Sequence, residues 1–264
     1  MNSQGLTSEA ALTIQFAGIV VITALSLFIT RSMRRTSLDY WAWAWACLSL
    51  ALGSLLIGFT WPILRPIVLS VYYLGEYAFA FLFIAGCRNR ASGVRLQTRD
   101  LRLLPAGIAL AAALTLLQRD FNIAFIPHAA ILASLFVVAY KALKPARTPG
   151  PSRPGFRVMS IALILLALDF FHYIVVFTYS LTIGHHTQIS YLRYTSIYDL
   201  ILEMLLGFGT VMLVMDDARE ALEEVNRELT TARDRLEVLA RVDPLTEALN
   251  RHAFYSLLDS ERPA

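Results

Sequence analysis

Residues 215–242 read MDDAREALEEVNRELTTARDRLEVLARV, and this stretch divides the chain into an apolar part before it and a short segment after it. Apolar or small side chains recur in it at alternating intervals of three and four residues, and charged residues fill most positions between them. This heptad spacing predicts a helix with one apolar face that pairs with a second copy in a parallel coiled coil. The face is formed by Met215, Ala218, Leu222, Val225, Leu229, Ala232, Leu236 and Leu239, and it ends before Asp243.

The chain upstream of this helix has the composition of a membrane protein. Of its 264 residues, 56% are hydrophobic and 16% are charged, whereas soluble domains average about 25% charged residues. A helix needs roughly 20 apolar residues to cross a bilayer. We therefore predict an all-α, polytopic membrane protein with a seven-transmembrane-helix bundle, whose spans lie at residues 11–30, 38–59, 66–86, 103–118, 122–140, 157–179 and 196–215.

The charges of the connections predict the orientation. The first, third and fifth connections carry thirteen lysine and arginine residues, and the second, fourth and sixth carry three. Because cytoplasmic loops are enriched in basic residues, the N-terminus is predicted to be outside and the C-terminus cytoplasmic. Trp41, Trp43 and Trp45, at the cytoplasmic end of the second span, are typical of an aromatic belt at the membrane surface.

The predicted domains follow from these patterns. Residues 1–215 form the transmembrane domain, residues 216–242 the cytoplasmic coiled-coil helix, and residues 243–264 a separate C-terminal segment. The helical pattern from residue 196 to residue 242 contains only two glycines, Gly207 and Gly209, both in the last span. These glycines indicate either close helix packing or a flexible point where the last helix bends or rotates.

Six ionisable residues lie inside the predicted spans. Charged side chains are costly in the hydrocarbon region, so each of them requires a partner or a function. We expect them to sense a ligand or stimulus, and we expect Glu76, Asp169, His172 and Glu203 to line one outward-facing cavity. The six residues are Glu76, His128, Asp169, His172, Asp199 and Glu203, and Tyr72, Tyr73, Tyr77, Tyr173 and Tyr179 add hydroxyl groups on the same spans.

The residues leave the nature of the stimulus open. A divalent metal ion would suit a mixed set of histidine and carboxylate ligands, drawn from His172, Asp169, His128 and Glu76. The two histidines could instead ligate a haem, or the cluster could respond to protons. A small ligand such as a lipid or quinone needs no special residue. A retinal Schiff base is excluded because the only lysines, at positions 141 and 144, lie in a predicted loop.

Residues 243–254, DPLTEALNRHAF, resemble the opening motif D-x-L-T-G-L-x-N-R-R-x-F of GGDEF domains. These domains are the diguanylate cyclases of bacterial cyclic di-GMP signalling. The motif's glycine, second leucine and second arginine are replaced here by Glu247, Ala248 and His252. The matching residues are Asp243, Leu245, Thr246, Asn250, Arg251 and Phe254.

The resemblance implies that residues 243–264 are the N-terminal fragment of a GGDEF domain. Such a domain binds GTP and Mg²⁺ and joins two GTP molecules into cyclic di-GMP. The chain contains no G-G-[DE]-E-F signature, so we expect no catalytic residues and no cyclase activity from the sequence as given.

Together, the topology and the resemblance imply a sensory input module in the bacterial inner membrane. It would relay an outer-side or intramembrane stimulus through the dimeric coiled coil to control a diguanylate cyclase. The expected partners are the lipid bilayer, a second copy of the chain and an unidentified small ligand, metal or proton, and no nucleic acid. The alternatives are a metal- or haem-binding membrane protein that uses the histidine and carboxylate cluster, or a proton-coupled transporter.

Overall fold

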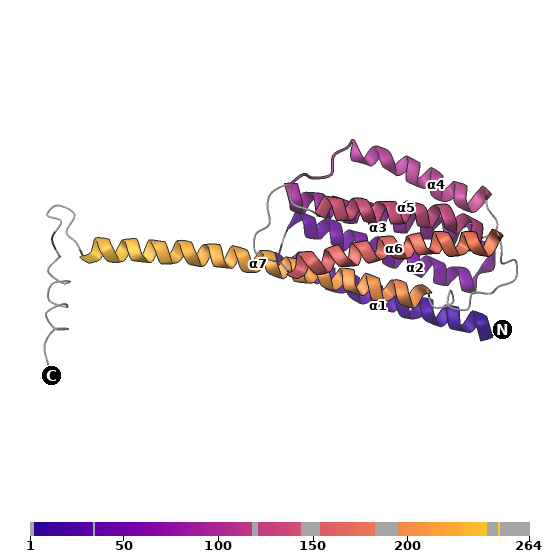
Figure 1. Ribbon diagram of the computed structural model, residues 1–264, viewed down its shortest axis with the longest axis horizontal. Helices are drawn as coiled ribbons and strands as arrows, with labels where there is room; N and C mark the ends of the chain where they lie inside the picture. Colours follow the sequence, from indigo (N-terminus) through magenta and orange to yellow (C-terminus); the bar gives the residue numbers. More distant parts are fainter. Residues whose placement is uncertain are drawn as a thin grey trace. The chain divides into compact units, whose positions relative to one another are not determined.

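The computed structural model describes residues 3–33, 35–117, 121–143, 154–182, 195–241 and 248. All regular elements within these residues are helical, so the predicted all-α class is confirmed. The elements are α1 (Ser3–Met33), α2 (Thr36–Thr60), the 3₁₀ turn η1 (Pro62–Leu64), α3 (Arg65–Ser92), the 3₁₀ turn η2 (Asp100–Leu103), α4 (Leu104–Leu117), α5 (Phe121–Leu143), α6 (Pro154–Thr182) and α7 (Thr195–Arg241) (Figure 1).

The chain divides into two compact units, Met1–Leu213 and Val214–Ala264. The division falls two residues before the boundary predicted from the sequence. Helix α7 contributes to both units, because it is helical without interruption from Thr195 to Arg241. The first unit is a helical bundle, and the described part of the second unit is almost entirely helix.

Six helices in the described part of the chain are long and apolar enough to cross a membrane: α1, α2, α3, α5, α6 and α7. The fourth predicted span corresponds to α4, which has only 14 residues. At 1.5 Å per residue α4 is about 21 Å long, against a hydrocarbon core of about 30 Å. It nevertheless runs lengthwise along the bundle beside α3 (Figure 1), and a 2.6 Å hydrogen bond between the Ser70 and Thr115 hydroxyls joins the two helices.

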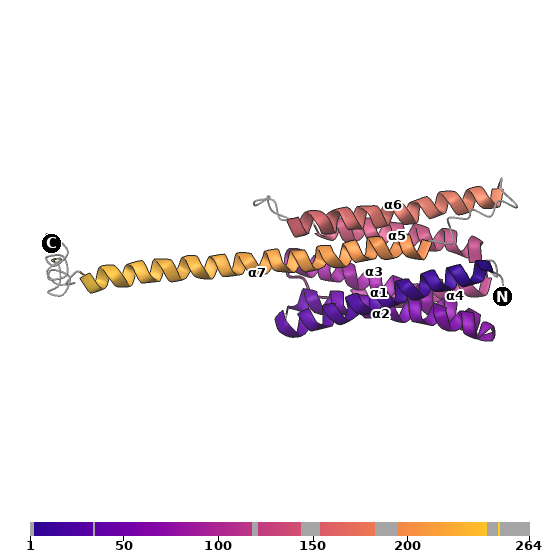
Figure 2. The same cartoon turned by 90° about the horizontal axis from the view of Figure 1, so that it is seen from below.

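Successive helices of the first unit run in alternating directions (Figures 1 and 2). The α2–α3 pair makes the most extensive contact, followed by α5–α6 and α1–α2. As a result, the junction of α1 with α2, the connection from α3 to α4, the end of α5 and the start of α6 lie at the same end of the bundle (Figure 1). The described basic residues of these segments therefore gather at this end; they are Arg31, Arg35, Arg88, Arg90, Arg95, Arg99, Arg102, Lys141 and Arg157.

The tryptophans of α2 do not form the predicted belt together. Trp41 and Trp45 are buried against α3, where they contact Phe83 and Phe79, whereas Trp43 is 64% exposed. Positions four apart share one face of a helix, and a position two residues away lies on the opposite side. Only Trp43 therefore remains available to a membrane surface.

Helices α6 and α7 approach each other closely through two glycines. A Cβ atom at Gly209 would lie 2.7 Å from the backbone nitrogen of Met159, and one at Gly155 would meet the backbone of Met212 and Leu213. Glycine at both points allows backbone-to-backbone packing, as in other membrane helix pairs. The observed role of Gly209 is thus close packing, within a helix that continues unbroken through it.

Candidate functional site

A buried hydrogen bond between a histidine and a glutamate joins α3 to α5 in the interior of the bundle. His128 has no solvent-exposed surface, and its Nε2 lies 2.7 Å from Oε2 of Glu76. Its other ring nitrogen, Nδ1, lies 3.0 Å from the hydroxyl of Tyr77. Both ring nitrogens are therefore occupied by side chains of α3, Nε2 by Glu76 and Nδ1 by Tyr77.

Aromatic rings enclose this pair. The centroid of the His128 ring lies 4.5 Å from that of Tyr73, and the rings of Tyr72, Tyr77 and Phe125 lie between 5.3 and 5.9 Å from it. The hydroxyl of Tyr73 is buried and has no hydrogen-bond partner among the described residues. The rings exclude solvent, and in so apolar a setting the Glu76–His128 pair is strengthened while any unpaired charge is penalised.

Two carboxyl groups on α7 face the same interior. The Gln15 side chain of α1 donates a 2.9 Å hydrogen bond to Oε2 of the buried Glu203. One turn earlier on α7, Oδ1 of Asp199 accepts a 2.9 Å hydrogen bond from the Tyr173 hydroxyl of α6. Helix α7 is thus held through its carboxyl groups by the helices on both sides.

The carboxyl groups form one electrostatic cluster. Asp199 lies within interaction range of Asp169 and Glu203, and Glu203 in turn interacts with Glu76. One carboxyl oxygen of Asp169 is buried without a hydrogen-bond partner in the described part of the chain. With His128 bound to Glu76, the cluster spans α3, α5, α6 and α7, and it brings together five of the six polar residues identified in the sequence: Glu76, His128, Asp169, Asp199 and Glu203.

His172 is placed differently. It is exposed at the surface of the bundle, next to the buried Tyr173 on α6. The i, i+3 spacing from Asp169 put both residues on one side of the helix, but α6 is rotated so that Asp169 lies at the edge of the packed face and His172 beyond it. The expectation that His172 lines the interior with Glu76 and Glu203 does not fit this arrangement.

Gln15 is a member of the cluster that sequence reasoning missed. It is buried near the start of the first predicted span, residues 11–30, and it is the one amide side chain in that span. A lone polar side chain in a membrane span was the available signal. Its partner, 188 positions further along the chain, could not be read from spacing.

The arrangement does not favour a metal or haem site. Within the described residues no three histidine, cysteine, aspartate or glutamate side chains are placed to hold a metal ion. The two histidines proposed as haem ligands lie in different environments, and both nitrogens of His128 are engaged. Of the four carboxyl groups, that of Glu76 is hydrogen-bonded to the imidazole, while those of Asp199 and Glu203 bond to Tyr173 and Gln15.

The predicted dimer face of α7 is exposed along its length. Leu222, Val225, Leu229 and Leu236 expose between 51% and 70% of their surface. On the remaining surface, Arg219 pairs with Glu223 at 2.9 Å and Arg227 lies 3.7 Å from Glu224. An apolar row of this kind beside solvated ion pairs is typical of a helix that binds a partner.

The residues of the resemblance to GGDEF domains lie outside the described part of the chain. These are Asp243, Leu245, Thr246, Asn250, Arg251 and Phe254, and the side chain of Leu239 is likewise not described.

The whole chain was also compared with known proteins. No family model matches it, and neither the curated proteins nor the solved structures give a significant match.

Proposed function

We propose that the chain is the membrane input module of a signalling receptor. In this proposal the buried cluster detects a stimulus from the outer side or from within the membrane, and α7 carries the response to the cytoplasm. The proposed topology has the N-terminus outside and seven crossings of the bacterial inner membrane, with the 14-residue α4 as a short fourth crossing.

One observation carries this proposal. Helix α7 bears Asp199 and Glu203 of the buried cluster and, in the same uninterrupted helix, the exposed row that contains Leu222, Val225 and Leu229. A helix is stiff over this length, so a change in the hydrogen bonds to Gln15 or Tyr173 can rotate or shift the row. A few kcal/mol of differential stabilisation changes the balance between two arrangements of α7, and about 5.5 kcal/mol makes the switch nearly complete.

The proposed output is control of a diguanylate cyclase through a parallel coiled-coil dimer. Its support is the heptad pattern of residues 215–239 and the resemblance of residues 243–254 to the GGDEF opening motif. A cyclase that joins two GTP molecules requires two catalytic domains to face each other, so the rotation of a dimeric linker would set its activity.

The test fuses the chain to an intact cyclase domain and measures cyclic di-GMP in cells. We expect Glu203→Gln and Asp199→Asn to shift the output, because each replaces a carboxyl group with an amide that cannot ionise, while keeping an acceptor for Gln15 or Tyr173. The matched control is Asp39→Asn, which makes the same chemical change at an exposed position on α2. Output from both cluster variants equal to that of the control would reject the sensing role of the cluster.

A further inference from the structure

The connection between α3 and α4, residues 93–103, is a second polar feature that the proposed signalling role does not use; we call it the arginine loop. It begins at Gly93, whose φ of 70° is the left-handed conformation that glycine adopts most readily. Its backbone N–H donates a 2.7 Å hydrogen bond to the carbonyl of Asn89 and closes α3. The Asn89 side chain then donates to the carbonyls of Gly93 and Val94, at 3.3 Å each.

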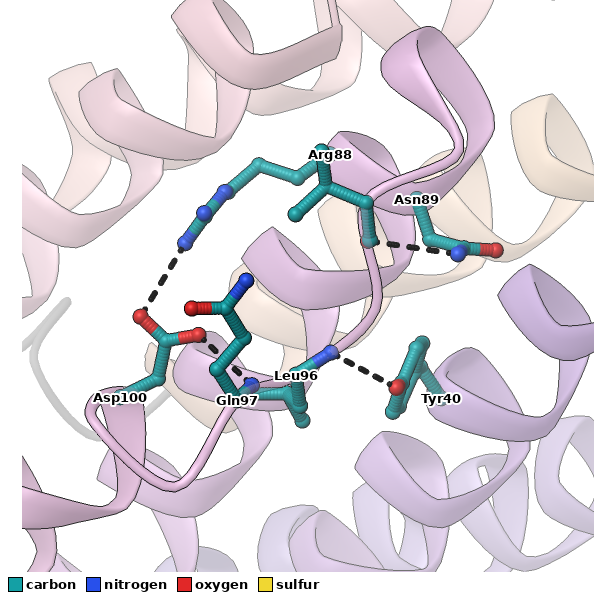
Figure 3. Close-up of polar contacts among 7 residues, drawn as sticks. Tyr40, Arg88, Asn89, Leu96, Gln97 and Asp100 are labelled. Atoms are coloured by element: carbon teal, nitrogen blue, oxygen red, sulfur yellow. Dashed lines mark hydrogen bonds and ion pairs between the residues drawn. The ribbon is translucent and has the colours of Figure 1, made fainter.

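Further hydrogen bonds fix the rest of the arginine loop (Figure 3). The N–H of Leu96 donates to the Tyr40 hydroxyl of α2 at 3.0 Å. The N–H of Gln97 donates to Oδ2 of Asp100 at 3.0 Å, and Oδ1 of Asp100 pairs with Arg88 at 3.6 Å. These hydrogen bonds and the Arg88–Asp100 ion pair attach the loop to α2 and α3. They fix the backbone that carries the other side chains of the loop.

The loop has an excess of positive charge. Its one acidic residue, Asp100, is already engaged by Arg88 and by the Gln97 N–H. Arg95, Arg99 and Arg102 are exposed and have no ion-pair partner among the residues that the structure describes. Three guanidinium groups within eight residues thus remain without a compensating anion from the described chain.

Apolar side chains are interleaved with these arginines. Val94 is 39% exposed and Leu101 46% exposed, and Trp43 is exposed on α2, three residues beyond Tyr40. The loop also connects two apolar helices, so it lies at the end of the bundle where the hydrocarbon region gives way to water. Exposed apolar groups beside arginines suit a lipid, which offers both acyl chains and a phosphate, better than a soluble anion.

We propose that the arginine loop is a binding site for the headgroup of an anionic phospholipid. Arg95, Arg99 and Arg102 contact the phosphate and the headgroup, and guanidinium groups suit this because they can donate two parallel hydrogen bonds to one phosphate. Val94 and Leu101 contact the upper acyl chains. The site is separate from the buried cluster, and it does not depend on the signalling role proposed above.

The experiment uses the full chain reconstituted in vesicles of equal parts phosphatidylglycerol and phosphatidylcholine. The protein is extracted in mild detergent, and the lipids that remain bound are counted by native mass spectrometry. Wild type is expected to retain phosphatidylglycerol preferentially. Each arginine near an anionic lipid contributes about fivefold in affinity, so the triple variant R95Q/R99Q/R102Q should lose roughly tenfold to a hundredfold of that preference.

Two matched variants separate charge from geometry. R227Q/R233Q/R235Q removes three exposed arginines from α7 and should keep the wild-type preference. R95K/R99K/R102K keeps the charge but not the paired hydrogen bonds, so it should lie between wild type and the glutamine variant. It also tests the site if the glutamine variant does not fold.

Three results would overturn the proposal. They are equal retention of the two lipids by wild type, unchanged preference in both arginine-loop variants, and release of phosphatidylglycerol by inorganic phosphate alone. The last would show that the arginines bind free phosphate and not a lipid.

Discussion

The Glu76–His128 pair offers the sharpest test of the buried cluster, through a double-mutant cycle. Glu76→Leu removes the carboxyl group, and His128→Phe keeps a ring against Tyr73 and Phe125 while removing both nitrogens. Each single change removes one partner of the Nε2–Oε2 hydrogen bond and leaves the other polar atom buried without it, and the double change removes both groups together. The cycle therefore isolates the interaction between the two side chains from the packing that each makes separately.

The structure sets the expected magnitude. Hydrogen bonds between membrane helices average about 0.6 kcal/mol, with a maximum of about 1.7 kcal/mol. The Glu76–His128 distance is 2.7 Å, and the imidazole is fully buried. A short bond between ionisable partners belongs at the upper end of the range, so we expect a coupling free energy of about 1.5 kcal/mol.

The assay is reversible unfolding of the four proteins in mixed micelles of increasing dodecyl sulfate content, followed by circular dichroism. The control is the cycle Ser70→Ala with Thr115→Val, across a 2.6 Å hydrogen bond between α3 and α4. Both hydroxyls also bond to carbonyls of their own helices, so their coupling should be only about 0.5 kcal/mol. A Glu76–His128 coupling no larger than that of the control would refute the reasoning.

The other predictions concern helix packing and the dimer. Gly209→Leu should lower the free energy of unfolding by more than about 2 kcal/mol, because the new side chain meets the α6 backbone. Gly107→Leu should change it little, since no atom lies within 4 Å of a Cβ there. Equal losses for the two variants in the dodecyl sulfate assay would contradict the close crossing of α6 and α7. Serine at three positions of the exposed row should convert dimers to monomers in cross-linking and light-scattering experiments, and dimers that persist would place the contact in the membrane unit. The row variant is L222S/L229S/L236S, and its control at the same spacing on another face is E220S/R227S/D234S.

Local composition alone determined the helical class and most of the predicted spans. Whether a segment forms a membrane helix depends on its own length and apolar content, and six of the seven predicted segments have both. The fourth did not reach the length of a crossing, because α4 ends after 14 residues. The continuous helix from the last span to Arg241 was also predictable, because no proline and only two glycines interrupt its pattern.

Tertiary packing decided which polar side chains meet. Glu76 and His128 are 52 positions apart, and Gln15 and Glu203 are 188 apart, so no local spacing relates them. The rotation of each helix about its axis is set by the residues that it buries, and this rotation turns Trp41 and Trp45 inward and His172 outward. The sequence by itself thus identified the residues that are costly in a membrane, and only the packing of the helices showed which of them compensate one another.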